Sequence, residues 1–318
     1  MKEITIFTAP KPFVNPHISM IQRNAIRSWK ALGEQVEIFL IGDEPGIREA
    51  AQELGVGFIP EVKRNSSGTP LISSIFEVAR QSSQARLLAY VNADILLMKS
   101  FLTGAQAAAA QKEKFLVVGR RWDLEVLEEI NFTPDWEDRL MQQVKEHGKL
   151  HGAKGSDYFI YPKACFQDIP DFAVGRAGWD NWMLFQARWM HWPLINATQT
   201  IQIVHQQHDY SHLPDGQKHY RLPESSENTA LAGGRIATLF KLRDCSHEMN
   251  DGQVRRVGWF ETWKRFKREL EIFPLVGLHS RPLGLLFYAI ANPRRAWLDF
   301  RKRQRQNAES STVDAADV

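Results

Sequence analysis

The sequence RLLAYVNADILLM, residues 86–98, is an apolar run interrupted by two polar side chains, Asn92 and Asp94. A short apolar run bounded by polar segments is typical of a strand buried on both faces. Side chains at i and i+2 of a strand point the same way, so Asn92 and Asp94 are expected to project together from its carboxyl end. Two such groups can share a hard cation and a ribose hydroxyl, because Mg²⁺ and Mn²⁺ prefer oxygen ligands. The alternative is a plain turn, in which Asn and Asp bond to their own backbone.

Strand-like and helix-like segments alternate along the first 121 residues. Apolar runs predict strands at 4–9, 36–43 and 57–62, within 86–98, and at 115–121. Helical spacing predicts helices at about 17–32, 45–54, 70–81 and 103–113. The alternation predicts an α/β fold with βαβ units, in which a mostly parallel central sheet is flanked by helices.

The carboxyl ends of the expected strands are the first candidates for a site, because ligands of such sheets bind beyond those ends. The candidate residues there are Thr8, Ala9, Pro10, Asp43, Asn65, Thr69, Asn92, Ala93, Asp94, Arg120 and Arg121. Arg120 and Arg121 are neighbours on an expected strand and face opposite ways, so only one of the two is expected to enter a cleft.

The remainder of the chain is less regular and is rich in Trp, Gly, His and Pro up to residue 250. A helix is expected within 177–192, a strand at 201–205 and a linker near 244–256. Aromatic residues then recur at helical spacing over 255–273, and an apolar and basic segment follows at 283–305. The expected organisation is one domain over 1–250, with halves 1–121 and 122–250, a basic helical extension over 251–305 and a disordered tail over 306–318.

Composition excludes several classes of protein. The 318 residues carry a net charge of +3 and include two cysteines, Cys165 and Cys245, without a CxxC pair, so no disulfide framework is expected. No signal-peptide run opens the sequence and no stretch reaches the ~18 apolar residues of a membrane span, so a cytoplasmic location is expected. The sequence has no P-loop, no GxGxxG turn after a strand and no serine nucleophile elbow, which argues against an ATPase or a dinucleotide enzyme.

Four segments resemble the GT-A glycosyltransferases, in particular a group of bacterial and plant GT-A-like proteins, over about residues 3–245. They are YVNADI at 90–95, GSDYF at 155–159, GWDNW at 178–182 and HQQHDYSH at 205–212. The first is similar to the DxD region of that family, with Asn92 where an aspartate usually stands. The resemblance implies a GT-A fold, a nucleotide-sugar donor, Mn²⁺ or Mg²⁺ as cofactor, and a carbohydrate or lipid-linked acceptor. Asn92 leaves the site with one negative charge fewer, which would weaken metal binding or remove the dependence on a metal.

The resemblance also implies roles for individual residues. Asp94 would bind the metal, and His205 or His208 would supply a further ligand. The other strand-end candidates would bind the donor, and the loop 213–221, with Lys218 and Arg221, would close over its diphosphate. Two other interpretations of the histidine cluster stay open, namely a zinc site and a polar loop.

Asp180 is expected to be the general base of an inverting transfer, with Asp157 in reserve. Partial burial between Trp179 and Trp182 would raise the pKa of Asp180, and these two indoles together with Tyr158 are expected to bind the acceptor. The alternative is that Asp180 caps the helix that follows it. A retaining transfer would need no such base, and Asp180 would then contact the acceptor.

Basic charge gathers toward the C-terminus. Residues 255–305 hold 13 Lys/Arg and 4 Asp/Glu, whereas 306–318 carry a net charge of −3. Basic side chains among aromatic and aliphatic ones suit an anionic membrane surface, which makes a peripheral membrane location an expectation. The alternative is a pair of helices packed on the body with a solvated basic face. No nucleic-acid motif accompanies the charge, so no nucleic-acid partner is expected.

Two other functions fit the same fold. A sugar nucleotidyltransferase usually carries a glycine-rich basic loop after the first strand, and residues 8–12, TAPKP, do not form one. A non-catalytic sugar-binding module would keep the fold and lose the metal, and Asn92 is compatible with that. A metal-dependent glycosyltransferase is the leading hypothesis.

Overall fold

The structure is a computed structural model that describes residues 2–208, 222–298, 300 and 301. The chain forms two compact units, one of Met1–Arg188 and Trp192–Val257, the other of Trp189–His191 and the chain from Gly258 onward. The segment 244–256, expected as a linker next to a boundary at residue 250, contains a strand hairpin at 247–256, and the larger unit extends to Val257. The predicted donor ligand Lys218 lies outside the described residues.

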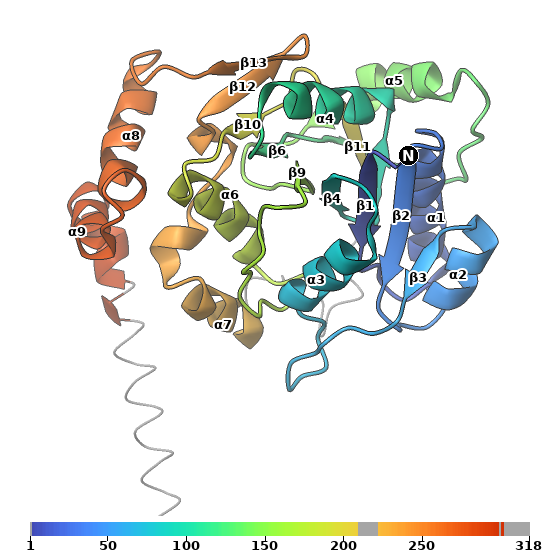
Figure 1. Cartoon of the computed structure of the whole chain (residues 1–318), viewed down its shortest axis with the longest axis horizontal. Helices are drawn as coiled ribbons and strands as arrows, with labels where there is room; N and C mark the ends of the chain where they lie inside the picture. The colour runs from blue at the N-terminus through green and yellow to red at the C-terminus, as the bar shows by residue number, and fades with distance from the viewer. Residues whose placement is uncertain (1, 209–221, 299, 302–318) are drawn as a thin grey trace, which may run out of the picture. The chain divides into compact units, whose positions relative to one another are not determined.

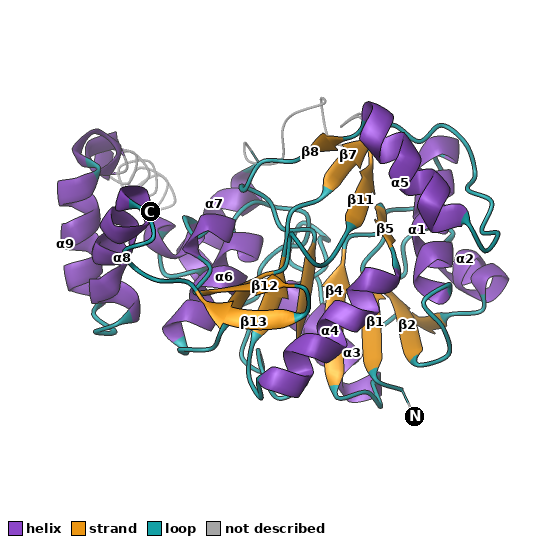
Figure 2. Cartoon of the chain, turned by 90° about the horizontal axis from the view of Figure 1, so that it is seen from above, coloured by secondary structure: helices purple, strands orange, loops and turns teal. Residues whose placement is uncertain are grey.

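A nine-stranded mixed sheet forms the centre of the larger unit (Figures 1 and 2). Its strands, in spatial order, are β13 (Gln253–Arg256), β12 (His247–Asn250), β10 (Leu194–Asn196), β6 (Leu116–Val118), β9 (Tyr158–Pro162), β4 (Leu87–Val91), β1 (Ile4–Thr8), β2 (Val36–Ile41) and β3 (Gly57–Ile59). Five neighbouring pairs are parallel. β9 runs antiparallel between β4 and β6, and β13 antiparallel to β12. The predicted mostly parallel sheet is therefore confirmed.

Helices follow the strands in the sequence, as expected for βαβ units. In the larger unit they are α1 (Pro16–Lys30), α2 (Ile47–Leu54), α3 (Ile72–Ser82), α4 (Lys99–Gln111), α5 (Trp136–His147), α6 (Trp179–Trp189) and α7 (Pro223–Leu231), with 3-10 turns η3 (Arg235–Thr238) and η4 (Leu242–Asp244). α1 begins where it does because the Asn15 side chain accepts a hydrogen bond from the Ile18 amide (3.1 Å) and Pro16 occupies the first turn.

Both faces of the sheet are apolar, so helices cover both. Ile6 and Ala89 point to one face and share a core cluster with apolar residues of α1 and α4. Their neighbours Phe7 and Tyr90 point to the other face, where their rings lie 5.0 and 5.6 Å from the ring of Phe76 in α3. This alternation is the period of two that strands impose on their side chains.

A second, four-stranded sheet follows the order β5 (Ile95–Leu97), β11 (Ile203–Gln206), β7 (Trp122–Leu124) and β8 (Lys149–Leu150). The prediction of one strand within 86–98 is thereby corrected, because the chain leaves the main sheet after Val91, turns, and enters the second sheet as β5. Hydrophobicity could not show this break, since β4 and β5 are both fully buried.

The smaller unit contains two helices packed on each other, α8 (Trp263–Val276) and α9 (Arg281–Ala291). The helix predicted over 255–273 begins at Trp263 instead, because β13 occupies the residues up to Arg256 and Thr262 caps the helix by accepting from the Arg265 amide (3.1 Å). In the part of the chain that the structure describes, no helix is long and apolar enough to cross a membrane.

Candidate functional site

Asp94 lies where the chain passes from the main sheet to the second sheet. The Ile95 amide donates to the carbonyl of Asn92 (3.1 Å), so residues 92–95 form a tight turn directly after β4. Ala93 is buried inside this turn. In β5, Ile95 pairs with His205 of β11. The turn that the sequence left open as an alternative is therefore present, and strand pairing beyond it brings Asp94 next to His205.

Asp94, His205 and His208 form a cluster with the composition of a metal site. Oδ2 of Asp94 lies 3.0 Å from Nε2 of His208 and 3.6 Å from Nε2 of His205. One potential ligand atom from each residue lies within 4.8 Å of the other two. Oδ1 of Asp94 is buried and has no hydrogen-bond partner among the described residues. One carboxylate and two imidazoles at this spacing fit a divalent cation, which would also satisfy the unpaired oxygen.

Charges around the cluster favour the ionised form of Asp94. Burial by itself would raise the pKa of Asp94, but hydrogen bonds with His205 and His208 and the charge of Lys11 hold it well below its ordinary value. Nζ of Lys11 lies 3.4 Å from Nε2 of His208. Burial lowers the pKa of His205, whereas its contacts with Asp123 and Asp94 outweigh burial and raise that pKa to about 9. Metal binding at His205 must therefore release a proton.

Asp123 organises the site, although no sequence pattern singled it out. It stands opposite His205 in the parallel pairing of β7 and β11, and its Oδ1 lies 3.3 Å from Nδ1 of His205. The same carboxylate accepts from Nε of Arg121 (2.8 Å) and lies 2.7 Å from Nδ1 of His151. A carboxylate on the second ring nitrogen of a ligating histidine fixes the orientation of that ring. The sequence did contain a signal for Asp123. This residue lies two positions after Arg121, so the two polar side chains are expected on the same face of a short strand.

Arg121 connects the cluster to the turn. Its guanidinium forms ion pairs with Asp123 and Asp157, and Oδ1 of Asp157 also accepts from Nδ2 of Asn92 (3.1 Å). Arg120 donates instead to backbone carbonyls of a neighbouring loop. One arginine of the pair, Arg121, therefore lines the cleft, as expected. Asp157, predicted as a reserve base, is buried and already paired with two donors, Arg121 and Asn92.

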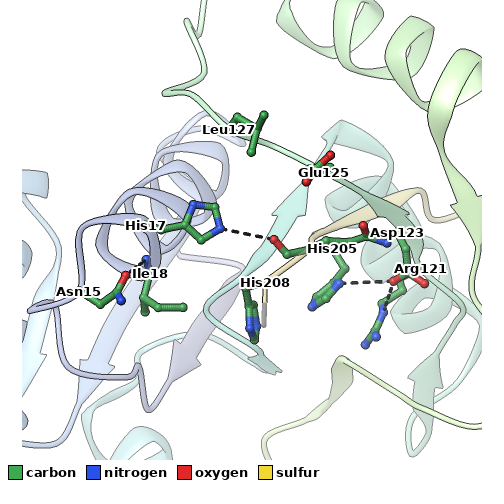
Figure 3. A pocket seen from close by; sticks show the side chains of 10 residues that line it. Asn15, His17, Ile18, Arg121, Asp123, Glu125, Leu127, His205 and His208 are labelled. Carbon is green, nitrogen blue, oxygen red and sulfur yellow. Dashed lines mark hydrogen bonds and ion pairs between the residues drawn. The ribbon is translucent and has the colours of Figure 1, made fainter. Parts of the chain in front are cut away.

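A cleft of about 600 Å³ opens beside the cluster (Figure 3). Its lining consists of Asn15, His17, Ile18, Arg121, Asp123, Glu125, Leu127, His205, Gln207 and His208. Pockets of about 300–1,000 Å³ are the usual size for small-molecule ligands. Asn15, His17 and Ile18, at the start of α1, were not predicted as site residues from the sequence. The signal that could have indicated them is the polar helix-capping residue Asn15, which follows the first strand.

Asp180 lies in the first turn of α6 and is half-buried. Burial raises its pKa to about 6, against the effect of backbone hydrogen bonds at Asn181 and Gly178, and the charge of Asp157 adds to the rise. The side chain therefore has the raised pKa that partial burial predicted.

The three residues predicted to bind the acceptor lie in the core. Tyr158, Trp179 and Trp182 are all buried. The Trp179 ring lies 5.1 Å from that of Tyr90, and the Trp182 ring lies 5.3 Å from that of Phe172. Rings enclosed in this way stabilise the core and leave no free face for a sugar. The three side chains from which the sequence predicted an acceptor site therefore pack in the core.

The remaining strand-end candidates do not line this cleft. They are Thr8, Ala9, Pro10, Asp43, Asn65 and Thr69. Thr8 is buried, with an Oγ1 that has no partner among the described residues. Asp43 pairs with Arg64, and Oδ1 of Asn65 accepts from the Thr69 amide (2.9 Å) as a turn residue does. Nδ2 of Asn65 also donates to Oε1 of Glu224 (2.7 Å) in α7, so the polar side chains of Asp43 and Asn65 are engaged in contacts between segments of the protein.

No protein-family model matches the chain. A search of curated proteins finds no match either. Among solved structures, several glycosyltransferases share part of the fold.

The mannosyltransferase PcManGT from Pyrobaculum calidifontis, in complex with GDP-Man and Mn²⁺, is 10% identical, with a TM-score of 0.40 over 64% of this chain and 56% of that chain. S. aureus TarS 1–349, in complex with UDP-GlcNAc, is 12% identical, with a TM-score of 0.45 over 74% of this chain and 66% of that chain. Glucosyl-3-phosphoglycerate synthase from Mycobacterium tuberculosis, with Mg²⁺ and UDP, is 13% identical, with a TM-score of 0.43 over 81% and 87%. The chain spans less than two thirds of the length of the first two. The overlap is partial, so a function for the chain has to rest on its own side chains.

Proposed function

We propose that the chain is a glycosyltransferase that moves a sugar from a nucleoside-diphosphate sugar to a carbohydrate or lipid-linked acceptor, with a divalent cation held by Asp94, His205 and His208. The observation that carries the proposal is the buried Oδ1 of Asp94, which has no hydrogen-bond partner in the part of the chain that the structure describes and lies next to two imidazoles that line a cleft of about 600 Å³. The cluster stands just beyond the carboxyl end of β4, which is where ligands of parallel sheets bind.

Several groups of the chain suit a diphosphate in this cleft. Lys11 lies beside the cluster, and Arg121 lines the cleft. Because Asp123 and Asp157 both hold the Arg121 guanidinium, its orientation is set before a ligand binds. Asn15, at the start of α1, also borders the cleft, and a helix start favours anionic groups. A bound divalent cation would add Lewis-acid stabilisation of the leaving diphosphate.

The ligand set favours Mn²⁺ over Mg²⁺ as the cation. Mg²⁺ prefers an all-oxygen shell, whereas imidazole suits transition metals. Zinc is the second candidate, since two histidines and a carboxylate also form zinc sites. Asn92, which stands at the first position of the DxD-like motif, donates to Asp157. In this proposal the cluster has two histidines, and one of them supplies the ligand that an aspartate in place of Asn92 would have given.

Asp180 is the residue to which we assign the proton transfer from the acceptor hydroxyl. With a pKa of about 6 it is ionised at neutral pH and is more basic than an ordinary aspartate. A base of this kind belongs to an inverting transfer. A retaining transfer is the alternative if the carboxylate proves dispensable.

Thermal shift with a panel of nucleotide sugars, each with Mn²⁺, Mg²⁺, Zn²⁺ or a chelator, tests the proposal. A cognate donor is expected to stabilise the protein in the presence of Mn²⁺, by about 2.7 kcal/mol at a hundredfold excess over its Kd. Asp94→Asn is expected to remove the metal-dependent part of the shift. The matched control Asp168→Asn changes an exposed carboxylate outside the cleft and is expected to leave the shift intact.

The outcomes separate the competing functions. Donor binding that is unaffected by a chelator contradicts the metal role, and binding without any turnover indicates a non-catalytic module. Formation of a nucleotide sugar from a sugar phosphate indicates a nucleotidyltransferase. A protein that binds no nucleotide sugar with any of the cations is not the enzyme proposed.

A further inference from the structure

Helix α9 of the smaller unit carries an exposed apolar stripe. Leu283, Leu286, Phe287 and Ile290 stand at positions i, i+3, i+4 and i+7, the spacing that places side chains on one face of a helix. Such a face normally packs against a core. Here the four side chains are 41%, 52%, 42% and 69% exposed.

The inner face of α9 is a different one. Gly284 and Tyr288, four residues apart, are the buried residues of the helix, which packs on α8. On a helix with 3.6 residues per turn, this pair lies well away from the line of Leu283, Leu286 and Ile290. The exposed stripe is therefore additional to the face that holds the two helices together.

Positive charge borders the stripe. Arg281 precedes it, and Arg294 and Arg295 follow it, all three exposed. The sequence holds no Asp or Glu between Glu271 and Asp299. In α8 the acidic residues Glu269 and Glu271 form ion pairs with Arg265 and Arg268 of that same helix.

Exposed aromatic and aliphatic side chains also follow α9 in the sequence. Trp297, Leu298 and Phe300 are 53%, 58% and 58% exposed. The guanidinium of Arg301 lies 4.1 Å from the ring centroid of Trp297. Indoles and arginines together are suited to the boundary between lipid headgroups and acyl chains, because both have an apolar body and a polar end.

We propose that this surface, consisting of the α9 stripe and its flanking arginines, docks on the surface of an anionic lipid bilayer. An apolar face without hydrogen-bonding groups, bordered by cations and not by acids, complements acyl chains beneath negatively charged headgroups. The eleven residues of α9 extend for about 16 Å, roughly half of the ~30 Å hydrocarbon core, so the helix lies in the plane of the interface.

Co-sedimentation of the full chain with vesicles tests the proposal. One set of vesicles contains phosphatidylcholine alone, and the other contains equal parts of phosphatidylcholine and phosphatidylglycerol. The protein is expected to bind the second set at least about tenfold more tightly, which corresponds to about 1.4 kcal/mol. Binding is expected to weaken in about 1 M salt, where charges are screened beyond about 3 Å.

Two variants separate the apolar from the electrostatic contribution. Ile290→Glu places a charge in the stripe and is expected to weaken binding to anionic vesicles at least about tenfold. The double variant Arg294→Gln/Arg295→Gln is expected to remove most of the preference for anionic lipid. Leu231→Glu, at a leucine of α7 in the larger unit that is 47% exposed, is the matched control and is expected to bind as the original chain does.

Circular dichroism and melting temperature confirm that each variant is folded before binding is compared. Failure of the full chain to bind anionic vesicles overturns the proposal. A stripe that covers a second copy of the chain would also overturn it, and would appear as a dimer in light scattering that Ile290→Glu dissociates. Because vesicle binding is measured without donor or acceptor, neither result bears on the proposed transfer reaction.

Discussion

Asp123 and His205 face each other across the parallel pair of β7 and β11, with 3.3 Å between Oδ1 and Nδ1. The contact leaves Nε2 of His205 directed toward Oδ2 of Asp94, 3.6 Å away. Two strands of three and four residues thus determine which ring nitrogen can meet a cation. Asp123 is a positioning residue, which acts through His205.

Asp123→Asn is expected to weaken metal binding about 10–100-fold, because an amide holds the imidazole less firmly than a carboxylate does. Calorimetric titration with Mn²⁺ measures this without any substrate. Glu125→Gln, at a second carboxylate in the cleft lining, is the matched control and is expected to keep the original affinity. Equal affinities for the Asp123 variant and the original chain would show that the pairing does not tune the site.

His205→Ala and His208→Ala are each expected to require at least about tenfold more Mn²⁺ for the same rise in melting temperature, since each removes one ligand of the cluster. His147→Ala removes an exposed imidazole of α5 and serves as the control. If only one of the two variants changes the titration, the cluster holds its cation with one histidine. If the Mn²⁺ titration is unchanged in both histidine variants, neither histidine is a metal ligand, and the segment around them is a polar loop.

Asp180→Asn is expected to lower the transfer rate by about 10²–10⁴ while donor binding stays unchanged, because the amide cannot accept the acceptor's proton. In the original chain the rate is expected to fall as the pH drops through about 6, where Asp180 takes up a proton. Steady-state rates over a pH series check both expectations. A fully active variant would remove Asp180 from the mechanism and favour a retaining transfer.

The same substitution has a predicted effect on stability. The pKa of Asp180 is raised from 3.8 to about 6 in the folded chain, so the folded state holds its proton more tightly than the unfolded state. The stability that this proton confers is present below pH 3.8 and is lost as the pH rises through about 6. Asp180→Asn is therefore expected to raise the melting temperature above pH 6 and to have little effect near pH 4. A lower melting temperature at neutral pH would instead point to a capping role.

His247 is expected to make the chain sensitive to acid. Burial, together with the charges of Lys112, Arg256 and Arg188, lowers the pKa of His247 from 6.5 to about 4. The unfolded chain therefore binds a proton at this residue before the folded chain does, and stability is lost as the pH falls from about 6.5 to about 4. His247→Gln is expected to flatten the dependence of melting temperature on pH over that interval. His147→Gln, at an exposed histidine, should not change it.

Trp179→Ala is expected to destabilise the chain by about 3–5 kcal/mol, because it empties a buried site between aromatic rings. Denaturant unfolding measures the effect. Trp263→Ala removes an indole that is 66% exposed and is expected to change stability much less. A stable Trp179→Ala variant that has lost acceptor binding would restore the role that the sequence suggested for this residue.

The sequence by itself determined the α/β class and most of its elements. Apolar runs such as those at 4–9 and 36–43 became β1 and β2, because a strand covered on both faces is mostly apolar. The end of the expected strand singled out Asp94, and the resemblance to the GT-A glycosyltransferases singled out His205 and His208. The two indoles of GWDNW suggested an acceptor site, but both are buried, and residue type alone does not distinguish a buried indole from an exposed one.

Only the tertiary structure decided how the site is assembled. Asp123 joins it through the register of β7 with β11, and Asp94 through the turn that carries the chain into β5. The register of a strand pair depends on contacts between segments far apart in the sequence, and no local sequence pattern specifies which residues become neighbours. The hairpin of β12 and β13 was hidden in the same way, because its polar residues resemble a linker until β10 supplies a neighbouring strand. Hydrophobic period is a local property of the chain, whereas the contacts that position these charged side chains arise only after the strands have paired.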